Sequence, residues 1–272
     1  MVSKSTVRKL LRKHGYVRRK ALKDKTHKSH PDRDEQFRHI TKLRKRFKRK
    51  KLPVISIDSK KKELLGTFYR DGKLYTQEAL SVNDHDFPTY ATGKVVPHGI
   101  YDIVNNKAHV NIGLSADTSE FSCDSLLLWW NSYGKYDYPD ATEILILADG
   151  GGSNAANSNL VKVDLQRFAN ETGLKVTIAH YPPYCSKYNP IEHRLFPHVT
   201  RACQGVVFET VEIVKELIAK TKTAKGLRVT VDVIDKVYET GRKLAAGVID
   251  AVNIARDKVL PLWNYTISPQ HN

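Results

Sequence analysis

The chain has 272 residues, of which 40% are hydrophobic, and this is enough to bury a sizeable core in one main domain with a smaller appendage. The net charge is +16, but residues 1–51 carry 21 Lys and Arg against 4 Asp and Glu, whereas residues 52–272 carry 24 against 25. No run of 18 apolar residues exists and the three cysteines show no CxxC spacing, which argues against a membrane span, secretion and a disulfide framework and favours a reducing cytoplasm.

The first 51 residues form a basic arm. A basic arm on a nearly neutral body is typical of polyanion binding, because each neutralised phosphate releases condensed counterions. Nucleic acid is therefore the expected partner, although a solvated tail or an address signal is the simpler alternative. The candidate DNA contacts in this arm are Lys9, Arg12, Lys13, Arg18, Arg19, Arg44, Lys45, Arg46, Lys48 and Arg49.

Two helices are predicted in the arm. The first follows a Ser3 or Ser5 cap and ends at Gly15, and it resembles the last helix of a helix-turn-helix module. Because the earlier helices of such a module do not precede it, we expect the numbered chain to be a piece of a longer ancestral protein or to start at an internal Met. The second helix, from residue 33 to about 50, has apolar residues at three- and four-residue spacing and ends before Pro53.

The body opens with predicted antiparallel strands. VISID, residues 54–58, is predicted to be a short buried strand. Asp71-Gly72 lies between segments rich in strand-forming residues and predicts a hairpin turn. Residues 78–97 lack periodicity and are expected to form a loop. A second hairpin is predicted around Asn105-Asn106.

Helices and strands alternate in the second half of the chain. A helix starting at Thr118 or Ser119 precedes the strand at residues 143–149, a helix closed by Gly173 precedes the strand at 175–181, and a further helix opens at Pro190. This order predicts an α/β fold, a mixed sheet flanked by helices, and matches the ribonuclease H-like fold. The expected organisation is the arm at 1–51, a catalytic domain at 52–208 and a helical C-terminal extension at 209–272.

Three acidic residues stand in distinctive settings. Asp58 and Asp149 each end a buried strand, and Glu192 lies at the start of the helix opened by Pro190. Ligands collect at the carboxyl ends of strands in such sheets, and carboxylate oxygens suit Mg²⁺ or Mn²⁺, which polarise phosphates. We therefore expect the substrate to be a phosphodiester. Each acid alone also fits a plainer role, as a turn, a cap or a partner of the helix dipole.

The glycines after Asp149 allow a sharp turn. Gly150 is the first glycine of the DGGGSN stretch, and Ser153, Asn154 or Asn157 is available to cap the following helix. A phosphate-cradling nucleotide loop is disfavoured, because neither GxxxxGK[ST] nor GxGxxG is present.

The motifs SKYNPIEHRLF, VISIDSKKKELLG and ILADGGGSN together resemble those of DDE transposases of the ISAzo-type insertion-sequence family, with acids 91 and 43 residues apart. The resemblance implies that Asp58, Asp149 and Glu192 bind two Mg²⁺ or Mn²⁺ ions, cut one strand at each element end and join the 3′-hydroxyl to target DNA. It implies terminal inverted repeats and target DNA as partners, a homodimer in the synaptic complex, and a bacterial, nucleoid-associated location. Further candidates around the site, for positioning phosphates or supporting the acids, are Ser59, Lys60, Ser186, Lys187, Asn189 and His193.

Other features admit weaker functional interpretations. Asp84, His85 and Asp86 resemble a metal cluster but lack further ligand spacing, and Trp129 with Trp130 should place at least one ring in the core rather than on DNA bases. The competing functions are an inert DNA-binding relic of a transposase and a nuclease of the same fold without strand transfer.

Overall fold

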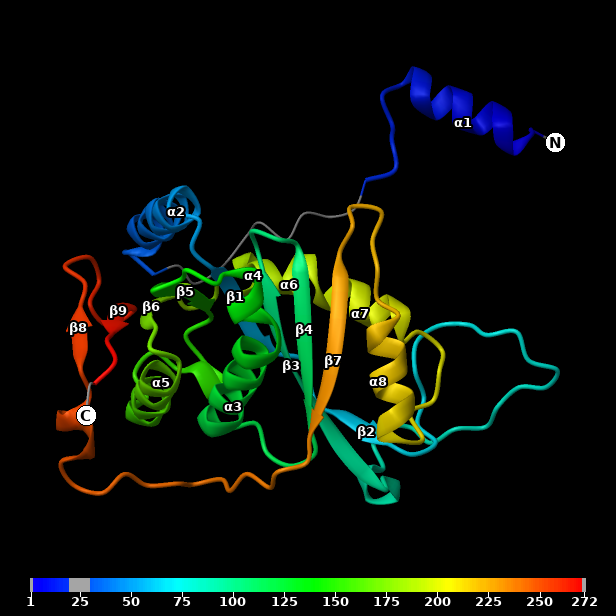
Figure 1. Cartoon of the computed structure of the whole chain (residues 1–272). Coiled ribbons are helices and arrows are strands. Elements are labelled where there is room, and N and C mark those ends of the chain that lie inside the picture. Colours follow the sequence, from blue (N-terminus) through cyan, green and yellow to red (C-terminus); the bar gives the residue numbers. More distant parts are fainter. Residues whose placement is uncertain (1, 20–29, 271–272) are drawn as a thin grey trace.

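A nine-stranded mixed sheet organises the molecule, and the computed structural model describes residues 2–19 and 30–270 of it (Figure 1). The strand order is β7-β4-β3-β1-β5-β6-β9-β8, with the short β2 paired to β3. The strands are β1 (Val54–Ser59), β2 (Glu63–Leu65), β3 (Gly93–Asp102), β4 (Lys107–Gly113), β5 (Glu143–Ala148), β6 (Lys175–His180), β7 (Arg228–Ile234), β8 (Ile254–Arg256) and β9 (Asn264–Ile267).

Strands β1, β5 and β6 are parallel neighbours at the centre of the sheet. Their side chains alternate between the two faces, and both faces are covered, so these strands are almost continuously apolar. β3 runs antiparallel to β1, and β3 and β4 form the hairpin predicted around Asn105-Asn106. The central part of the expected ribonuclease H-like fold is thus confirmed.

Helices lie on both faces of the sheet (Figure 1). α3 (Ser119–Trp129) and α5 (Asn159–Thr172) pack on the face that carries Ile55, Ile57, Ile144 and Ile146. The opposite face is covered by α2 (Arg33–Arg49), α6 (Pro190–Arg194), α7 (Phe196–Ala202) and α8 (Val211–Ala219). Six short helical segments lie between these elements: η1 (Pro88–Tyr90), η2 (Trp130–Gly134), α4 (Lys135–Asp137), η3 (Gly152–Asn154), η4 (Ser186–Tyr188) and η5 (Val248–Ala251).

The two helices of the basic arm form as predicted but differ in packing. α1 (Lys4–Lys13) begins where Ser3 accepts a hydrogen bond from the amide of Thr6, and it buries no residue. α2 buries Ile40, Leu43 and Phe47 against the sheet. α2 is therefore part of the body, whereas α1 keeps all its side chains exposed.

Hydrogen bonds of the Gln36 side chain also fix α2 to strands β6 and β9. The side chain of Gln36 donates to the carbonyl oxygen of His180 at 2.7 Å, and the amides of Gln36 and Asn264 exchange hydrogen bonds of 2.7 and 2.6 Å. Gln36 and Asn264 are both buried, so removing either would leave buried polar atoms unpaired.

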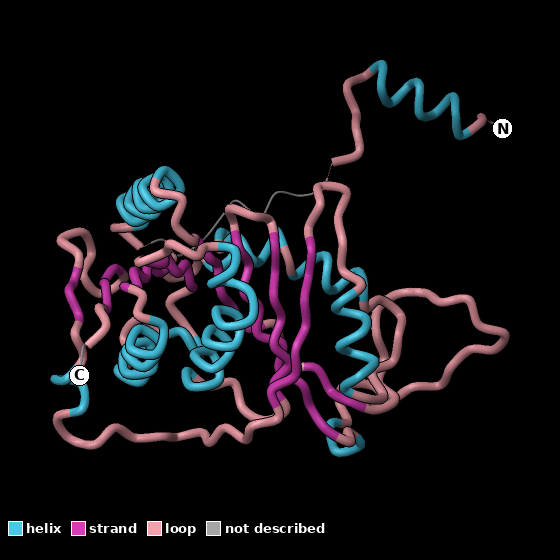
Figure 2. Tube along the Cα trace, in the orientation of Figure 1, coloured by secondary structure: helices cyan, strands magenta, loops and turns pink. Residues whose placement is uncertain are grey.

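Several local predictions are wrong. Residues around Asp71-Gly72 do not form a hairpin, because the segment between β2 and β3 is a long loop (Figure 2). Gly72 is needed instead for a close approach, since a Cβ there would lie 2.5 Å from the backbone nitrogen of Gly205. The loop expected at 78–97 ends early, because β3 begins at Gly93. The helix opened by Pro190 is broken at Leu195 into α6 and α7.

The expected helical C-terminal extension is wrong beyond α8. Residues 228–234 form β7, which pairs in parallel with the whole of β4, and β9 pairs with β6. The acid and apolar spacing of residues 231–241 suggested a helix, but the open edge of β4 provides backbone partners for an extended chain rich in Val, Thr and Ile. Each end of the sheet is therefore completed by the C-terminal segment.

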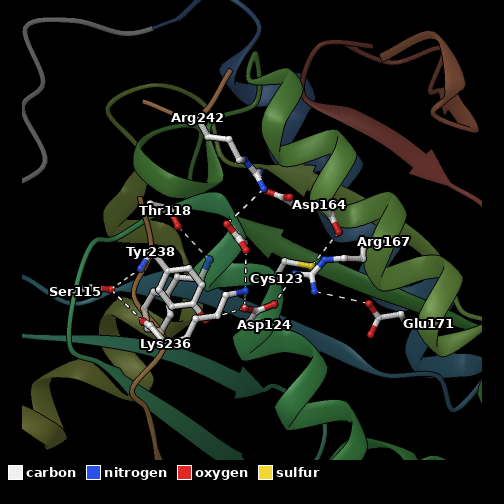
Figure 3. A network of polar contacts seen from close by, with 12 residues as sticks. Ser115, Thr118, Cys123, Asp124, Asp164, Arg167, Glu171, Lys236, Tyr238 and Arg242 are labelled. Carbon is white, nitrogen blue, oxygen red and sulfur yellow. Dashed lines mark hydrogen bonds and ion pairs between the residues drawn. The ribbon is translucent and has the colours of Figure 1, made fainter. Parts of the chain in front are cut away.

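An ionic network secures the long connection between β7 and β8 (Figure 3). Asp124 of α3 accepts from Lys236 at 2.9 Å, from Tyr238 at 2.7 Å and from Arg167 of α5 at 2.5 Å. Farther along, Arg242 pairs with Asp164 of α5. Burial would raise the pKa of Asp124, but hydrogen bonds from Lys236 and Arg167 outweigh it and the pKa is lowered.

We expect Asp124→Asn to destabilise the protein by about 2 kcal/mol at neutral pH, because it removes the charge that Lys236 and Arg167 neutralise. The folded pKa of Asp124 lies below its unfolded value, so this stabilisation is present above about pH 4 and is lost as the pH falls through the folded pKa. Thermal unfolding at several pH values measures it. Glu216→Gln, which removes an exposed ion pair with Lys220, is the control and should change stability by less than about 0.5 kcal/mol. Equal effects of the two variants would contradict the role of the network.

Candidate active site

The strand register brings Asp58 and Asp149 together. Ser56 of β1 pairs in parallel with Leu147 of β5, and continuing this register by two residues sets Asp58 beside Asp149. Adjacent strands are about 4.8 Å apart, and residues two apart share a face. Both acids therefore leave the carboxyl ends of neighbouring strands on the face covered by α6.

Glu192 reaches this edge because α6 is fixed directly to β1. The side chain of Asn189 accepts a hydrogen bond from Ser56 at 2.5 Å and donates to the carbonyl oxygen of Ile57 at 3.0 Å. The hydroxyl oxygen of Ser56 accepts in turn from the amide of Ile191 at 3.0 Å. Ser56, Asn189 and Ile191 are each 0% exposed. We call this contact the Ser56–Asn189 clamp. It bonds Ile191, the residue before Glu192, to Ser56, which lies two residues before Asp58 in β1.

Close packing of α6 on the sheet also needs a small residue opposite it. Gly99 of β3 pairs with Asp58, and a Cβ at Gly99 would lie 2.7 Å from the Cδ1 of Ile191 and 2.9 Å from Phe196. A larger residue at Gly99 would push α6, and with it Glu192, away from the strand ends.

The acids influence one another strongly. Burial, the charges of Asp149 and Glu192, and a side-chain contact with Glu192 together raise the pKa of Asp58 to about 8. The pKa of Asp149 is also raised, first by burial and then by the charges of Glu192 and Asp117. Buried carboxylates whose pKa is raised by neighbouring acids lack a neutralising positive charge, which is what a divalent cation supplies.

The donor set fits a hard divalent cation. All three side chains offer only carboxylate oxygens, which Mg²⁺ and Mn²⁺ accept readily and which zinc sites seldom use alone. Within residues 2–19 and 30–270, no three His, Cys, Asp or Glu side chains lie close enough together to hold a metal ion. The acids are therefore neighbours that must move closer to coordinate a shared ion.

Asp117 is an acid at this edge that the sequence patterns did not single out. It lies in the turn before α3, and its carboxylate accepts a hydrogen bond from the hydroxyl of Ser59 at 2.9 Å. Its charge also raises the pKa of Asp149. The hydroxyl of the predicted site residue Ser59 is thus already engaged in a hydrogen bond with Asp117.

A buried polar chain supports the loop after Asp149. The Nε2 of His98 and the hydroxyl of Ser122 are 3.0 Å apart, and Ser122 donates to the side chain of Asn154. The Nε2 of His180 lies 3.0 Å from the carbonyl oxygen of Asn154. Burial lowers the pKa of both histidines to about 4, so both are neutral near pH 7. Asn154 is therefore held by Ser122 and His180, and the prediction that it caps the next helix is wrong, because Ser158 caps α5.

The other predicted auxiliary residues are spread around the edge. Gly150 is exposed and does not have a positive φ. In this loop the positive φ, +59°, belongs to Gly152. Lys60 donates to Glu63 at 2.5 Å and is already neutralised. Ser186, Lys187 and His193 are exposed, with Lys187 above the ring of Tyr188.

The weaker alternatives find no support in the described residues. His85 lies 2.8 Å from the carbonyl oxygen of Tyr69 and stacks on Phe68, and no metal-binding group forms around it. Trp129 and Trp130 are both buried, which confirms at least one core ring. Cys123, Cys185 and Cys203 are free and buried.

The predicted DNA contacts of the arm are exposed or half-buried. Those on and after α1 are all exposed, and on α2 only Arg44 is half-buried, since the helix directs its apolar residues to the sheet. Along the described ranges no helix has the length and apolar character needed to cross a bilayer.

The chain thus combines a ribonuclease H-like sheet with two acids at neighbouring strand ends and a third acid on a helix fixed to the same edge. The model of the family described as the Rhodopirellula transposase DDE domain matches residues 1–269, and the chain belongs to this family. The resemblance deduced from the three motifs is confirmed.

Solved structures of Mos1 transposase share the fold. A pre-cleavage Mos1 transpososome is 14% identical, with a TM-score of 0.51, and the match covers 79% of this chain and 62% of that chain. A Mos1 paired-end complex with left transposon end is 15% identical, with a TM-score of 0.49, and the match covers 79% and 61% of the two chains. The chain thus spans about three fifths of these proteins. No curated protein matches the sequence.

We expect Ser56→Ala to destabilise the protein by about 2–3 kcal/mol, because it leaves the buried side chain of Asn189 and the amide of Ile191 without partners. Urea unfolding measures this loss. Ser186→Ala is the matched control, since Ser186 is exposed. If both variants unfold at the same urea concentration, the clamp does not stabilise the site.

We expect Asp58→Asn to stabilise the metal-free protein at pH 8 by about 1–3 kcal/mol. The folded pKa of Asp58, about 8, exceeds the unfolded value near 4, so the wild type loses stability as the pH rises from 4 to 8, and the variant escapes this loss. Thermal unfolding in chelator checks the effect, with the exposed Asp140→Asn as control. A wild-type stability that rises over this interval in parallel with the variant would contradict the coupling.

Proposed function

We propose that this protein is a DNA transposase in which Asp58, Asp149 and Glu192 together hold divalent cations for phosphodiester chemistry. The observation that carries the proposal is the placement of the three acids at the meeting point of β1, β5 and α6, where burial and neighbouring acids raise the pKa of Asp58 and of Asp149. Membership of the DDE transposase family supports the reaction class. The partners are the terminal inverted repeats of the element and target DNA, in the bacterial nucleoid.

Two Mg²⁺ or Mn²⁺ ions, when bound, would polarise the scissile phosphate and activate the attacking water or 3′-hydroxyl. The chain's own contribution is placement. The rigid strand ends fix Asp58 and Asp149, while the Ser56–Asn189 clamp fixes the helix that carries Glu192. With the three acids at one edge of the sheet, hydrolysis at an element end and attack of the freed 3′-hydroxyl on target DNA can use one site in succession. No covalent protein intermediate is required.

Joining two element ends to one target requires two active sites close together, so we propose a homodimer in the synaptic complex. The exposed cations of α1 and of residues 18–19 would add affinity for the phosphate backbone rather than sequence reading.

We expect the protein to nick supercoiled plasmid in Mg²⁺ or Mn²⁺ and Asp149→Ala to lower the rate at least about 100-fold, because the variant loses a carboxylate ligand. Asp140→Ala, which removes an exposed acid, should nick at the wild-type rate. Gel analysis of the plasmid forms gives the rates.

A second assay with oligonucleotide element ends and target plasmid separates the candidate functions. Joined products support transposition, and nicking without joining indicates a nuclease of the same fold. DNA retardation with no cleavage in either metal would indicate an inert relic and would overturn the proposal.

A further inference from the structure

One edge of the nine-stranded sheet is open. β7 is the last strand in the sheet order and pairs on one side only, with β4. An edge strand presents a row of unpaired backbone N–H and C=O groups on its outer side. Among residues 2–19 and 30–270, no backbone group of residues 228–234 forms a hydrogen bond outside the pairing with β4. Figure 1 shows α3 and α8 beside β7, on the two faces of the sheet, rather than along this edge.

The open strand lacks the features that usually prevent pairing with other chains. Edge strands of soluble proteins are commonly short, or carry a proline, a bulge or a lysine. β8, at the other end of the sheet, has only three residues. β7 has seven residues, includes no proline or lysine, and pairs with β4 without a bulge. Five of the seven are β-branched, which favours the extended conformation that a further strand requires.

Two charged residues lie on the same face of β7. Arg228 and Thr230 line a hollow of about 250 Å³ together with Tyr133, as expected for side chains two residues apart in a strand. Asp232 lies on this face as well, since the hydroxyl of Tyr133 donates to its carboxylate at 3.4 Å. Arg228 is exposed, and no ion pair involves it within the described ranges.

The carboxylate of Asp232 also lacks a positive partner. The Nε2 of His109 lies 3.6 Å from it. Burial lowers the pKa of His109, so the imidazole is neutral near pH 7 and does not neutralise the carboxylate. In the part of the chain that the structure describes, no Lys or Arg pairs with Asp232. β7 thus carries an unpaired positive charge and an unpaired negative charge at a fixed spacing along one face.

This spacing is complementary to itself. Two copies related by a two-fold axis perpendicular to the sheet would place their β7 strands antiparallel, with each face of the sheet continued by the same face. When Thr230 lies opposite Thr230 of the second copy, each Arg228 lies opposite Asp232 of the other copy. Opposite charges directly across an antiparallel pair are favourable, and like charges are unfavourable. In this register both unpaired charges of each copy are neutralised.

We propose that β7 joins two copies of this chain as antiparallel strands centred on Thr230, so that their sheets become one continuous sheet. A second copy fits better than an unrelated strand, because a partner must carry both charges at the complementary spacing and a second copy supplies them. The inference goes beyond the proposed function, since this pairing needs neither metal nor DNA.

Sedimentation of the full chain in chelator and without DNA, over a range of protein concentrations, tests the pairing. We expect the wild type to form a dimer. Arg228→Glu and Asp232→Lys each set like charges opposite one another at two places, so each should raise the Kd of the dimer at least about tenfold. Lys243→Glu is the control, because it reverses the charge of an exposed residue in the connection after β7, and it should leave the Kd unchanged.

Mixing the two charge variants separates a direct contact from a folding defect. Arg228→Glu leaves two negative charges on the edge, and Asp232→Lys leaves two positive charges. An equal mixture should therefore form a heterodimer whose Kd is at least about tenfold lower than that of either variant alone. The double variant Arg228→Glu/Asp232→Lys should dimerise like the wild type. Misfolded chains would not recover on mixing.

Hydrogen exchange of the wild type gives an answer that does not depend on variants. Backbone amides of residues 228–234 should exchange more slowly as the protein concentration rises, whereas those of β8 should not change. A chain that stays monomeric at every concentration would overturn the proposal and would indicate that Arg228 and Asp232 keep the edge unpaired. A dimer that responds equally to Arg228→Glu and Lys243→Glu, or that protects a surface other than β7, would overturn it as well.

The outcome is separable from the proposed function. Plasmid nicking that depends on Asp149, by a chain that does not pair through β7, would refute the pairing and leave the transposase proposal standing. A dimer that depends on Arg228 and Asp232 but does not nick DNA in either metal would do the reverse.

Discussion

The burial of carboxylates that also repel one another, at the ends of neighbouring strands, is the constraint on which the site depends. The parallel register of β1 and β5 sets Asp58 beside Asp149, because Ser56 pairs with Leu147 two residues before each acid. A folded protein tolerates such a cluster only by keeping a proton there or by binding a cation. The raised pKa of Asp58 means that its carboxyl group keeps a proton to a higher pH, and in the proposed function a bound cation takes the place of that proton.

The third acid shows how a flexible surface position is made rigid. A five-residue helix has little stability of its own, yet α6 is fixed by Asn189 and Ser56 on one side and by Ile191 packed over Gly99 on the other. The same edge is supported from behind by the buried chain from His98 to His180. Structural polar groups and candidate catalytic groups therefore lie within a few residues of one another, and the former determine where the latter point.

The sequence predicted the part of the fold in which local pattern and tertiary environment agree. The sequence predicted the strands that end near Asp58 and Asp149 and the helix that starts at Pro190. Each of these elements combines a pattern of apolar residues with a distinct residue at its end. The strand β7 was not predicted, because its pairing with β4 joins residues more than 100 positions apart and no local signal marks the open edge it fills. Ser56 and Asp117 were missed for a similar reason, since their roles arise only from neighbours supplied by other elements. A serine inside an otherwise apolar strand was the available signal for Ser56.

Anomalous X-ray diffraction from crystals soaked in Mn²⁺ tests the central claim most directly. The account predicts anomalous peaks between Asp58, Asp149 and Glu192, with carboxylate oxygens of all three residues about 2.0–2.3 Å from the metal. The absence of a peak at this edge, or a peak coordinated elsewhere on the molecule, would contradict it.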